Sequence, residues 1–460
     1  MLVSDSPMLL LANSRSRRTL CGALALSLAL LAQGCSVSNT ALTNAAATSG
    51  PPTTASIKSA TASPSTSLSL SQPSGLPADE NLAKRPPVKV GLILPLSGGG
   101  QAAVVAESMK QAAELAIRDL GAKHMELLIR DDKGTPEGAM AAASDVVGQG
   151  AELVLGPLYS RSVTTVSAVA KSKNIPVVAF SNDRQVASSG THLLSFLAGP
   201  EITRVVSYAA SQGKRRYIAL IPDDAYGKLV EPSFREAVAR SGGSVLALAT
   251  YPTDTGGRVA SVLASVSKLR DEMRGLEEHN EPIDAIFIPG GDDTVQLLGP
   301  LLKQADIDTK RIRIIGTGAL DTPNASRDDT FVGAWFAAPD PRGFKDFSDK
   351  FAKAYGHAPP RIASLAYDAT SLAAALATGP DGARFIPSAL TRPSGFNGVD
   401  GIFRLMSDGV TDRALSVLEV QKFGATVIDL APTSLDTTLP GPSSALDQNA
   451  TPRGTVSKVN

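Results

Sequence analysis

The chain has 460 residues, of which 43% are hydrophobic and 19% are charged. This composition is typical of a folded globular protein and excludes a largely disordered chain or one that crosses a membrane many times. Basic and acidic residues number 44 each, so the formal net charge is zero. A chain without a basic excess offers no long-range field for nucleic acid, and no nucleic-acid partner is expected.

Residues 1–35 are expected to be a targeting segment. A basic run at 15–18 precedes an apolar run at 19–32 that is short for a membrane span. The sequence LAQGC follows, ends at Cys35, and resembles a bacterial lipoprotein lipobox in which two of the usual residues differ. Lipid attachment at Cys35 is therefore expected. The alternative is a plain signal peptide that is cut nearby, with Cys35 incidental.

Cysteine usage agrees with lipidation. The other cysteine, Cys21, lies inside the segment that would be removed. The mature chain is then expected to have a single cysteine, which carries lipid, and no disulfide. Its stability must come from core packing instead of crosslinks.

Two segments are expected to stay unfolded. Residues 36–87 and 431–460 are rich in Ser, Thr, Ala and Pro and bury too little apolar surface to fold. The first is expected to be a flexible tether with a root-mean-square span of about 40 Å, and the second a disordered tail. The remaining body, 88–430, has roughly 340 residues, which is more than one core usually supports, so two lobes are expected.

Within the body, short aliphatic runs alternate with segments of helical spacing. Runs predicted to be strands are 88–94, 125–130, 151–156, 175–180, 216–221, 244–251, 283–289 and 311–316. Strands separated by helices at this spacing predict an α/β protein with parallel βαβ units in doubly wound sheets. Ligands of such sheets bind beyond the C-terminal ends of the strands.

Two predicted helices have clear local signals. In residues 104–120 the apolar positions that recur every three or four residues are Val105, Met109, Ala112, Ala116 and Leu120. Thr135 is the expected N-cap of a second helix, whose first residue is Pro136.

No catalytic or metal site is predicted. The four histidines, His124, His192, His279 and His357, have no metal-ligand spacing, and neither a nucleophile elbow nor a P-loop is present. The sequence GTGALD at 316–321 lacks the third glycine of a dinucleotide loop. An enzyme is not expected, and neither is a cofactor.

Acidic pairs follow three of the predicted strands, at Asp131–Asp132, Asp223–Asp224 and Asp292–Asp293. Such pairs could bind a cation or share a proton. Aspartate at the start of a helix also caps it and interacts favourably with its dipole. Helix capping is the preferred interpretation.

Six segments resemble, in order, the type 1 periplasmic binding proteins of the leucine/isoleucine/valine-binding group. They are GLILPLSG (91–98), IRDDKGTPEGA (129–139), LVLGPLYSRS (153–162), NIPVVAFS (174–181), IPDDAYGK (221–228) and SLAYDATSLAAAL (364–376). The resemblance implies two α/β lobes that are joined by three crossings and close on a ligand like a clamshell. Lobe one would comprise 88–200 and 338–395, and lobe two 201–337 and 396–430.

The same resemblance implies where a ligand would bind. Ser160 and Ser162 match residues that contact a ligand carboxylate, with Arg161 in place of a small residue. The next loop has Ser181 followed by the bulky Asn182, and Tyr226 matches a tyrosine that packs across the cleft. The acid that usually holds the ligand ammonium is absent at Gly318, and Asp321, three residues later, is a candidate substitute.

A narrower resemblance favours a different role. Residues 283–321 are similar to a stretch of the outer-membrane lipoproteins that activate penicillin-binding proteins, where the same fold serves as a regulatory domain. Two functions therefore stay open. One is a lipid-anchored activator of a bifunctional penicillin-binding protein, and the other is a receptor that delivers an amino acid or amide to an ABC transporter permease.

The altered ligand loops and the long tether favour the activator. The chain is expected to face the periplasm and to touch the membrane through its lipid anchor only. In a host with two membranes, Ser36 in place of an aspartate after Cys35 predicts the inner leaflet of the outer membrane. In a host with one membrane, a lipidated transport receptor is the expectation instead.

Overall fold

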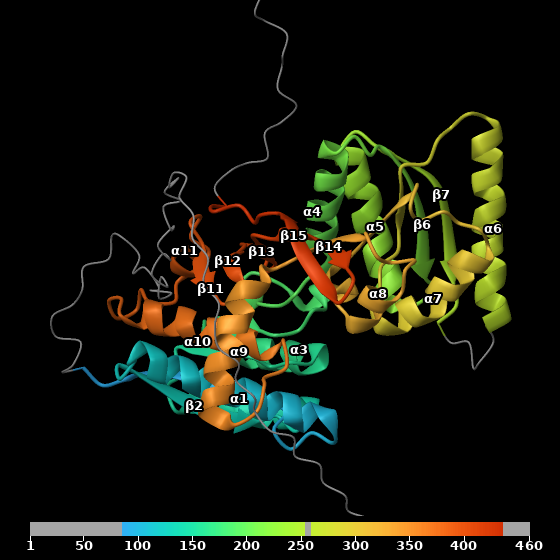
Figure 1. Ribbon diagram of the computed structural model, residues 1–460. Helices are drawn as coiled ribbons and strands as arrows, with labels where there is room; N and C mark the ends of the chain where they lie inside the picture. Colours follow the sequence, from blue (N-terminus) through green and yellow to red (C-terminus); the bar gives the residue numbers. More distant parts are fainter. Residues whose placement is uncertain (1–84, 254–258, 436–460) are drawn as a thin grey trace, which may run out of the picture. The chain divides into compact units, whose positions relative to one another are not determined.

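The computed structural model describes residues 85–253 and 259–435 (Figure 1). The targeting segment with Cys35, and nearly all of the expected tether and tail, lie outside these residues. Within the described ranges, no helix combines the length and apolar character that a membrane span requires.

The first lobe is built on a five-stranded parallel sheet in the order β2-β1-β3-β4-β5. Its strands are β1 (Val88–Leu94), β2 (Met125–Asp131), β3 (Leu153–Leu155), β4 (Val177–Ala179) and β5 (Thr191–Leu193). The helices that follow β1, β2 and β3 are α1 (Gln101–Leu120), α2 (Pro136–Gly148) and α3 (Ser160–Lys171). All four strands predicted in this region are found, whereas β5 was not predicted.

Both faces of this sheet are covered by helices. Val90, Leu92 and Leu94 of β1 pack with α1 on one face, whereas Ile93 packs with α2 and α3 on the other. Gly91 also faces α2, where a Cβ atom would lie 3.0 Å from a methyl group of Val146. Burial on both faces explains why β1 is a continuous aliphatic run and not an alternating one.

The two helix predictions are confirmed in most details. On α1, Met109, Ala112 and Ala116 are fully buried, but the prediction is wrong for Leu120, which is 36% exposed at the end of the helix. Thr135 caps α2 as predicted, because its side chain accepts a hydrogen bond from the Gly138 amide.

The second lobe contains a seven-stranded sheet in the order β15-β14-β10-β9-β8-β6-β7. Its strands are β6 (Arg216–Pro222), β7 (Ser244–Tyr251), β8 (Ala285–Phe287), β9 (Arg313–Gly316), β10 (Trp335–Ala338), β14 (Ser416–Gln421) and β15 (Gly424–Asp429). Strands β6 to β10 are parallel, and β14 and β15 add an antiparallel edge. The four predicted runs of this lobe correspond to β6 to β9, whereas β10, β14 and β15 were not predicted.

Helices again cover both faces of the second sheet. The core on one face includes residues of α4 (Ala198–Ser211) and α5 (Ala225–Arg240). The core on the other face includes residues of α6 (Val259–Glu278), α7 (Asp292–Gln304) and α8 (Pro323–Arg327). The two-lobed α/β fold is thus confirmed.

Residues 396–413 differ from the expected lobe assignment. They form a small antiparallel sheet of β11 (Phe396–Gly398), β12 (Gly401–Leu405) and β13 (Thr411–Arg413). Phe396, Phe403 and Leu405 belong to the core of the first lobe, and the Thr411 hydroxyl donates a hydrogen bond to the Leu193 carbonyl. Only the part of 396–430 from β14 onward joins the second sheet, because the apolar face of the small sheet is buried against the first lobe.

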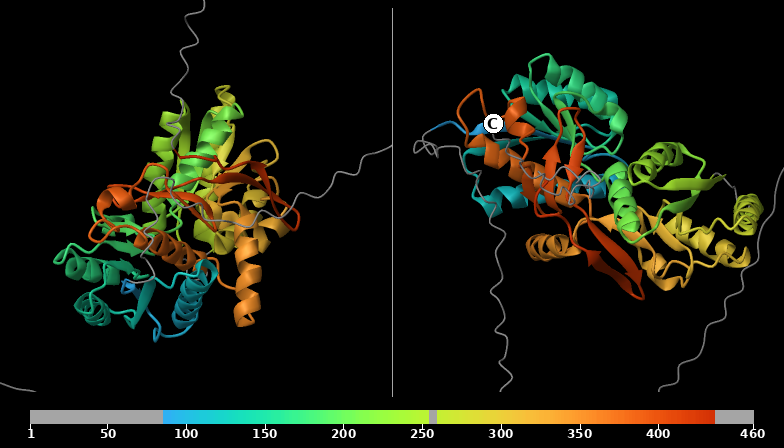
Figure 2. Two further views of the ribbon diagram at one scale, coloured as in Figure 1. Left: turned by 90° about the vertical axis from the view of Figure 1, so that its left-hand side faces the viewer. Right: turned by 90° about the horizontal axis from the view of Figure 1, so that it is seen from above.

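The helices α9 (Pro341–Tyr355), α10 (Ala363–Ala377) and α11 (Pro387–Leu390) also contribute to the core of the first lobe. The chain therefore passes between the lobes after β5, after β10 and after β13. Figure 2 shows the C-terminal segments, in orange and red, returning to both groups of elements.

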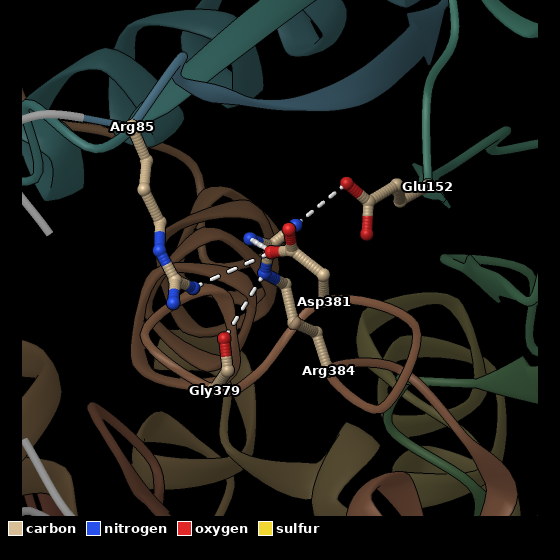
Figure 3. Close-up of polar contacts among 5 residues, drawn as sticks. All are labelled: Arg85, Glu152, Gly379, Asp381 and Arg384. Atoms are coloured by element: carbon tan, nitrogen blue, oxygen red, sulfur yellow. Dashed lines mark hydrogen bonds and ion pairs between the residues drawn. The ribbon is translucent and has the colours of Figure 1, made fainter. Parts of the chain in front are cut away.

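Arg384 connects the loop after α10 to the first sheet (Figure 3). The residue is 8% exposed, and its guanidinium donates to the Gly379 carbonyl, to the Glu152 carboxylate at 2.8 Å and to Asp381. Asp381 also accepts a hydrogen bond from Arg85. A residue from the start of the described body is thereby joined to the loop that follows α10.

Candidate functional site

A cavity of 910 Å³ is lined by residues of both lobes. The first lobe contributes a loop with Asn182, Asp183 and Gln185, and the second lobe contributes the segments that follow β6, β9 and β10. Placement at the C-terminal ends of these strands agrees with the prediction for ligand sites in doubly wound sheets.

Glu201 supplies a carboxylate at the wall of this cavity. It lies in the first turn of α4 and is 9% exposed, and its Oε2 atom accepts a 2.8 Å hydrogen bond from the Gly318 amide. Burial raises the pKa of Glu201 to about 7, although the Gly318 hydrogen bond and the charge of Arg413 oppose this rise. No other hydrogen bond to this carboxylate is made by the described residues, so Oε1 is left for a bound molecule.

Gly318 makes this placement of Glu201 feasible. A Cβ atom at position 318 would lie 3.2 Å from Oε1 of Glu201 and 3.2 Å from the Ala337 carbonyl oxygen. The acid that was expected near Gly318 is thus absent from its own loop but is supplied in space by α4. Sequence reasoning missed it because 117 positions separate the two residues.

Tyr226 and Thr317 form a hydroxyl pair in the same wall. The Tyr226 Oη and Thr317 Oγ1 atoms are 3.0 Å apart. Burial raises the pKa of Tyr226 to about 12, so its hydroxyl keeps its proton at neutral pH. The pair can therefore offer one hydrogen-bond donor to a bound molecule.

Asp321 and Arg361 add opposite charges. Desolvation by surrounding protein raises the pKa of Asp321, and the Arg361 charge opposes this effect. The Arg361 guanidinium donates to Asp400 at 2.5 Å and lies 4.4 Å from the centre of the Phe344 ring. These two contacts fix the position of the guanidinium where it lines the cavity.

The structure brings together only some of the predicted ligand-binding residues. Asn182, Tyr226 and Asp321 line the cavity. Ser181 is not a lining residue; it is buried, and its hydroxyl accepts a hydrogen bond from the Asp183 amide.

Ser160, Arg161 and Ser162 are not among the lining residues. They form the first turn of α3, with Arg161 exposed and Ser162 buried. The Ser162 hydroxyl points inward, where it lowers the pKa of Asp132 against the stronger effect of burial. The expected role of this turn in ligand binding stays a prediction.

The acidic pairs mostly serve local structure. Asp224 caps α5 by accepting from the Gly227 amide, and Asp292 and Asp293 lie in the first turn of α7. The capping interpretation is wrong for the pair at 131–132, whose carboxylates accept hydrogen bonds from the Lys133 and Gly134 amides of the loop before α2. Asp131 also accepts from the Ser97 amide in the loop after β1. No metal-binding group of His, Cys, Asp and Glu occurs in the part of the chain that the structure describes.

The comparison with a family model gives a match over most of the chain. The model described as "Periplasmic binding protein" matches residues 87–425.

Two curated proteins match part of the chain at low sequence identity. An uncharacterized protein of Rickettsia prowazekii is 20% identical over 243 residues, which are 53% of this chain and 63% of that protein. A Leu/Ile/Val-binding protein of Rhizobium johnstonii is 28% identical over 167 residues, which are 34% of this chain and 45% of that protein. The chain thus matches less than two thirds of the length of either relative.

Among solved structures, one from Rhodospirillum rubrum is described as a branched-chain amino acid ABC transporter. It is superposed with a TM-score of 0.63 at 19% identity, over 74% of this chain and 100% of that one. At this identity the likeness concerns the fold alone. Together with the family match, it shows that the chain belongs to the periplasmic binding protein family and has the type 1, leucine-binding-protein-like fold.

Proposed function

We propose that this protein is a non-catalytic solute receptor that binds a small amino-acid-like molecule in the cavity at Glu201. The observation that carries the proposal is the Glu201 carboxylate beside the Gly318 amide. A buried carboxylate with an unused oxygen is costly on its own, and a ligand ammonium group would offset that cost.

The rest of the lining supports a ligand with an anionic or amide end. Arg361, held by Asp400, and the hydroxyl pair of Tyr226 and Thr317 can donate to carboxylate or amide oxygens. Asn182, like Arg361, belongs to the first lobe and adds an amide group. A volume of 910 Å³ lies within the range of small-molecule sites and accommodates an amino acid with its side chain.

The names of the relatives support a proposal for the protein to which this receptor delivers its ligand. Their names include Leu/Ile/Val binding and ABC transport, which favours an ABC transporter permease as the partner of this chain. Lipid at Cys35 would hold the receptor at a membrane surface. Mass spectrometry of the purified mature protein tests this anchor, because an N-terminal residue other than lipidated Cys35 would contradict it.

Binding is tested by calorimetric titration of the whole protein with leucine, valine and glutamine. Two analogues test the contributions of the two charged groups of leucine: 4-methylpentanoate lacks the amine, and isoamylamine lacks the carboxylate. We expect Glu201→Gln to weaken amino-acid binding by about 10-fold or more, because a charge-assisted contact contributes roughly 1.5–3 kcal/mol.

The matched control is Glu236→Gln, which removes an exposed carboxylate of α5 outside the cavity. It should bind like the wild type. Equal affinity of the Glu201→Gln variant and the wild type, or no heat with any amino acid, would contradict the proposed site.

A second candidate is activation of a bifunctional penicillin-binding protein from the inner leaflet of the outer membrane. It is favoured by the resemblance of 283–321 to such activators, a segment whose last residues line the cavity. A pull-down with the whole protein tests it directly. Recovery of no penicillin-binding protein would count against this role and leave the receptor proposal untouched.

A further inference from the structure

A second cavity, of 290 Å³, lies within the first lobe and shares no lining residue with the cavity at Glu201. It is bordered by the C-terminal end of α1, the C-terminal half of α10 and the turn that leads into β11. Leu120, whose exposure departs from the predicted core pattern, is one of its walls. The exposed side of Leu120 at the end of α1 therefore borders this cavity.

Arg392 places a positive charge in this cavity. Its Nε atom donates to the Gly395 carbonyl at 2.7 Å, and its guanidinium lies 3.9 Å from the centre of the Phe396 ring. Desolvation lowers the pKa of Arg392. The lining contains no acidic residue, and the two Nη atoms make no hydrogen bond within the described ranges.

Ser371 supplies a buried hydroxyl in the same lining. The residue is 2% exposed, and its Oγ atom has no hydrogen-bond partner among the described residues. A buried hydroxyl without a partner is destabilising, and a bound polar atom would relieve that cost. His124 also lines the cavity, but its Nε2 atom already contacts the Ala374 carbonyl oxygen at 2.9 Å.

We propose that this cavity binds a small carboxylate with a compact apolar body. The carboxylate lies on the Nη edge of Arg392 and accepts from Ser371, while the apolar body packs against Leu120, Leu372 and Phe396. A guanidinium edge matches the two oxygens of a carboxylate, and stacking on Phe396 holds that edge in place. Because Arg392 is the only arginine or lysine in this lining, a monoanion suits the cavity better than phosphate.

Fluorine NMR of the whole protein with 4-fluorobenzoate tests the proposal. We expect Arg392→Gln to raise the dissociation constant about 10-fold or more and Ser371→Ala to raise it about 3- to 10-fold. The neutral analogue 4-fluorobenzamide should bind the wild type at least about 10-fold more weakly than 4-fluorobenzoate, because it lacks the charge that pairs with Arg392.

Two controls separate the cavities. Arg118→Gln removes a guanidinium of the same lobe that contacts Tyr355 and does not line the cavity, and Glu201→Gln alters only the other site. Both variants should bind 4-fluorobenzoate like the wild type. The proposal is overturned if Arg392→Gln and Ser371→Ala leave binding unchanged, if no binding occurs, or if phosphate displaces the probe as well as benzoate does.

Discussion

Glu201 makes stability depend on pH in a way that can be isolated. Its pKa rises from an ordinary value of 4.5 to about 7 in the folded protein. Between these values the folded protein holds a proton that the unfolded chain has lost, so the free energy of unfolding falls as pH rises through this window. Above it, the ionised carboxylate costs its full penalty.

Replacing Glu201 with glutamine keeps an acceptor for the Gly318 amide but removes the charge. We expect Glu201→Gln to be more stable than the wild type by roughly 2–3 kcal/mol near pH 8, and the difference to vanish near pH 4.5. Urea unfolding of both proteins at the two pH values measures this difference. Burial also raises the pKa of Asp368 to about 7. Because both proteins contain Asp368, its effect on stability cancels in the difference between them. An equal gain at both pH values would show that ionisation of Glu201 is not the cause.

Arg384 should matter far more than its exposed partner Asp381 (Figure 3). The arginine side chain is 8% exposed, whereas that of Asp381 is 77% exposed. Arg384→Gln leaves the Glu152 carboxylate and the Gly379 carbonyl without their donor, and we expect it to cost about 2–3 kcal/mol. Asp381→Asn should cost less than about 1 kcal/mol, because solvent screens an exposed pair. Equal losses in urea unfolding would contradict this ranking.

At the scale of elements, the N-terminus of α2 offers the clearest test. Thr135 accepts from the Gly138 amide, and Pro136 occupies the first turn. We expect Thr135→Ala to lower the free energy of unfolding by about 1 kcal/mol through loss of this cap. Thr135→Ser keeps the hydroxyl and should stay within a few tenths of the wild type. A loss in Thr135→Ser as large as that in Thr135→Ala would assign the effect to the methyl group instead.

The sequence predicted the parallel strands β1 to β4 and β6 to β9, but it missed β5, β10 and the C-terminal strands β11 to β15. All eight aliphatic runs contain strands, because burial on both faces leaves a strong local pattern. Among the missed strands, β5 and β11 have three residues each, and β5 contains a polar His192. The longer β14 and β15 pair with each other as an antiparallel edge. Such segments become strands through pairing with neighbours and not through local preference.

The cavity at Glu201 was predictable only in part. Tyr226 and the loop at Asn182 follow predicted strands, so the sequence alone predicts that they lie at the C-terminal ends of these strands. The contact between Glu201 and Gly318 depends instead on how α4 packs against β9 and β10, which no local pattern encodes. The same holds for Arg361, which reaches the cavity from the segment that precedes α10.

For the whole molecule, two separate sets of cores predict stepwise unfolding. Each lobe buries its own sheet between helices, and the chain joins them through three short passages. We therefore expect calorimetry of the whole protein to resolve two transitions, since large two-lobed chains often depart from two-state behaviour.

The only tryptophan of the chain, Trp335, identifies the transition of the second lobe. It lies in β10, is 8% exposed, donates to Glu419 and packs under Arg313, so its fluorescence follows that lobe. Because Glu201, Tyr226 and Asp321 are all in the second lobe, an amino-acid ligand should raise the temperature of the fluorescence transition. At about 100 times its dissociation constant the ligand adds about 2.7 kcal/mol. If heat and fluorescence instead report one coincident transition with and without ligand, the lobes unfold as a unit and the separate-core argument fails.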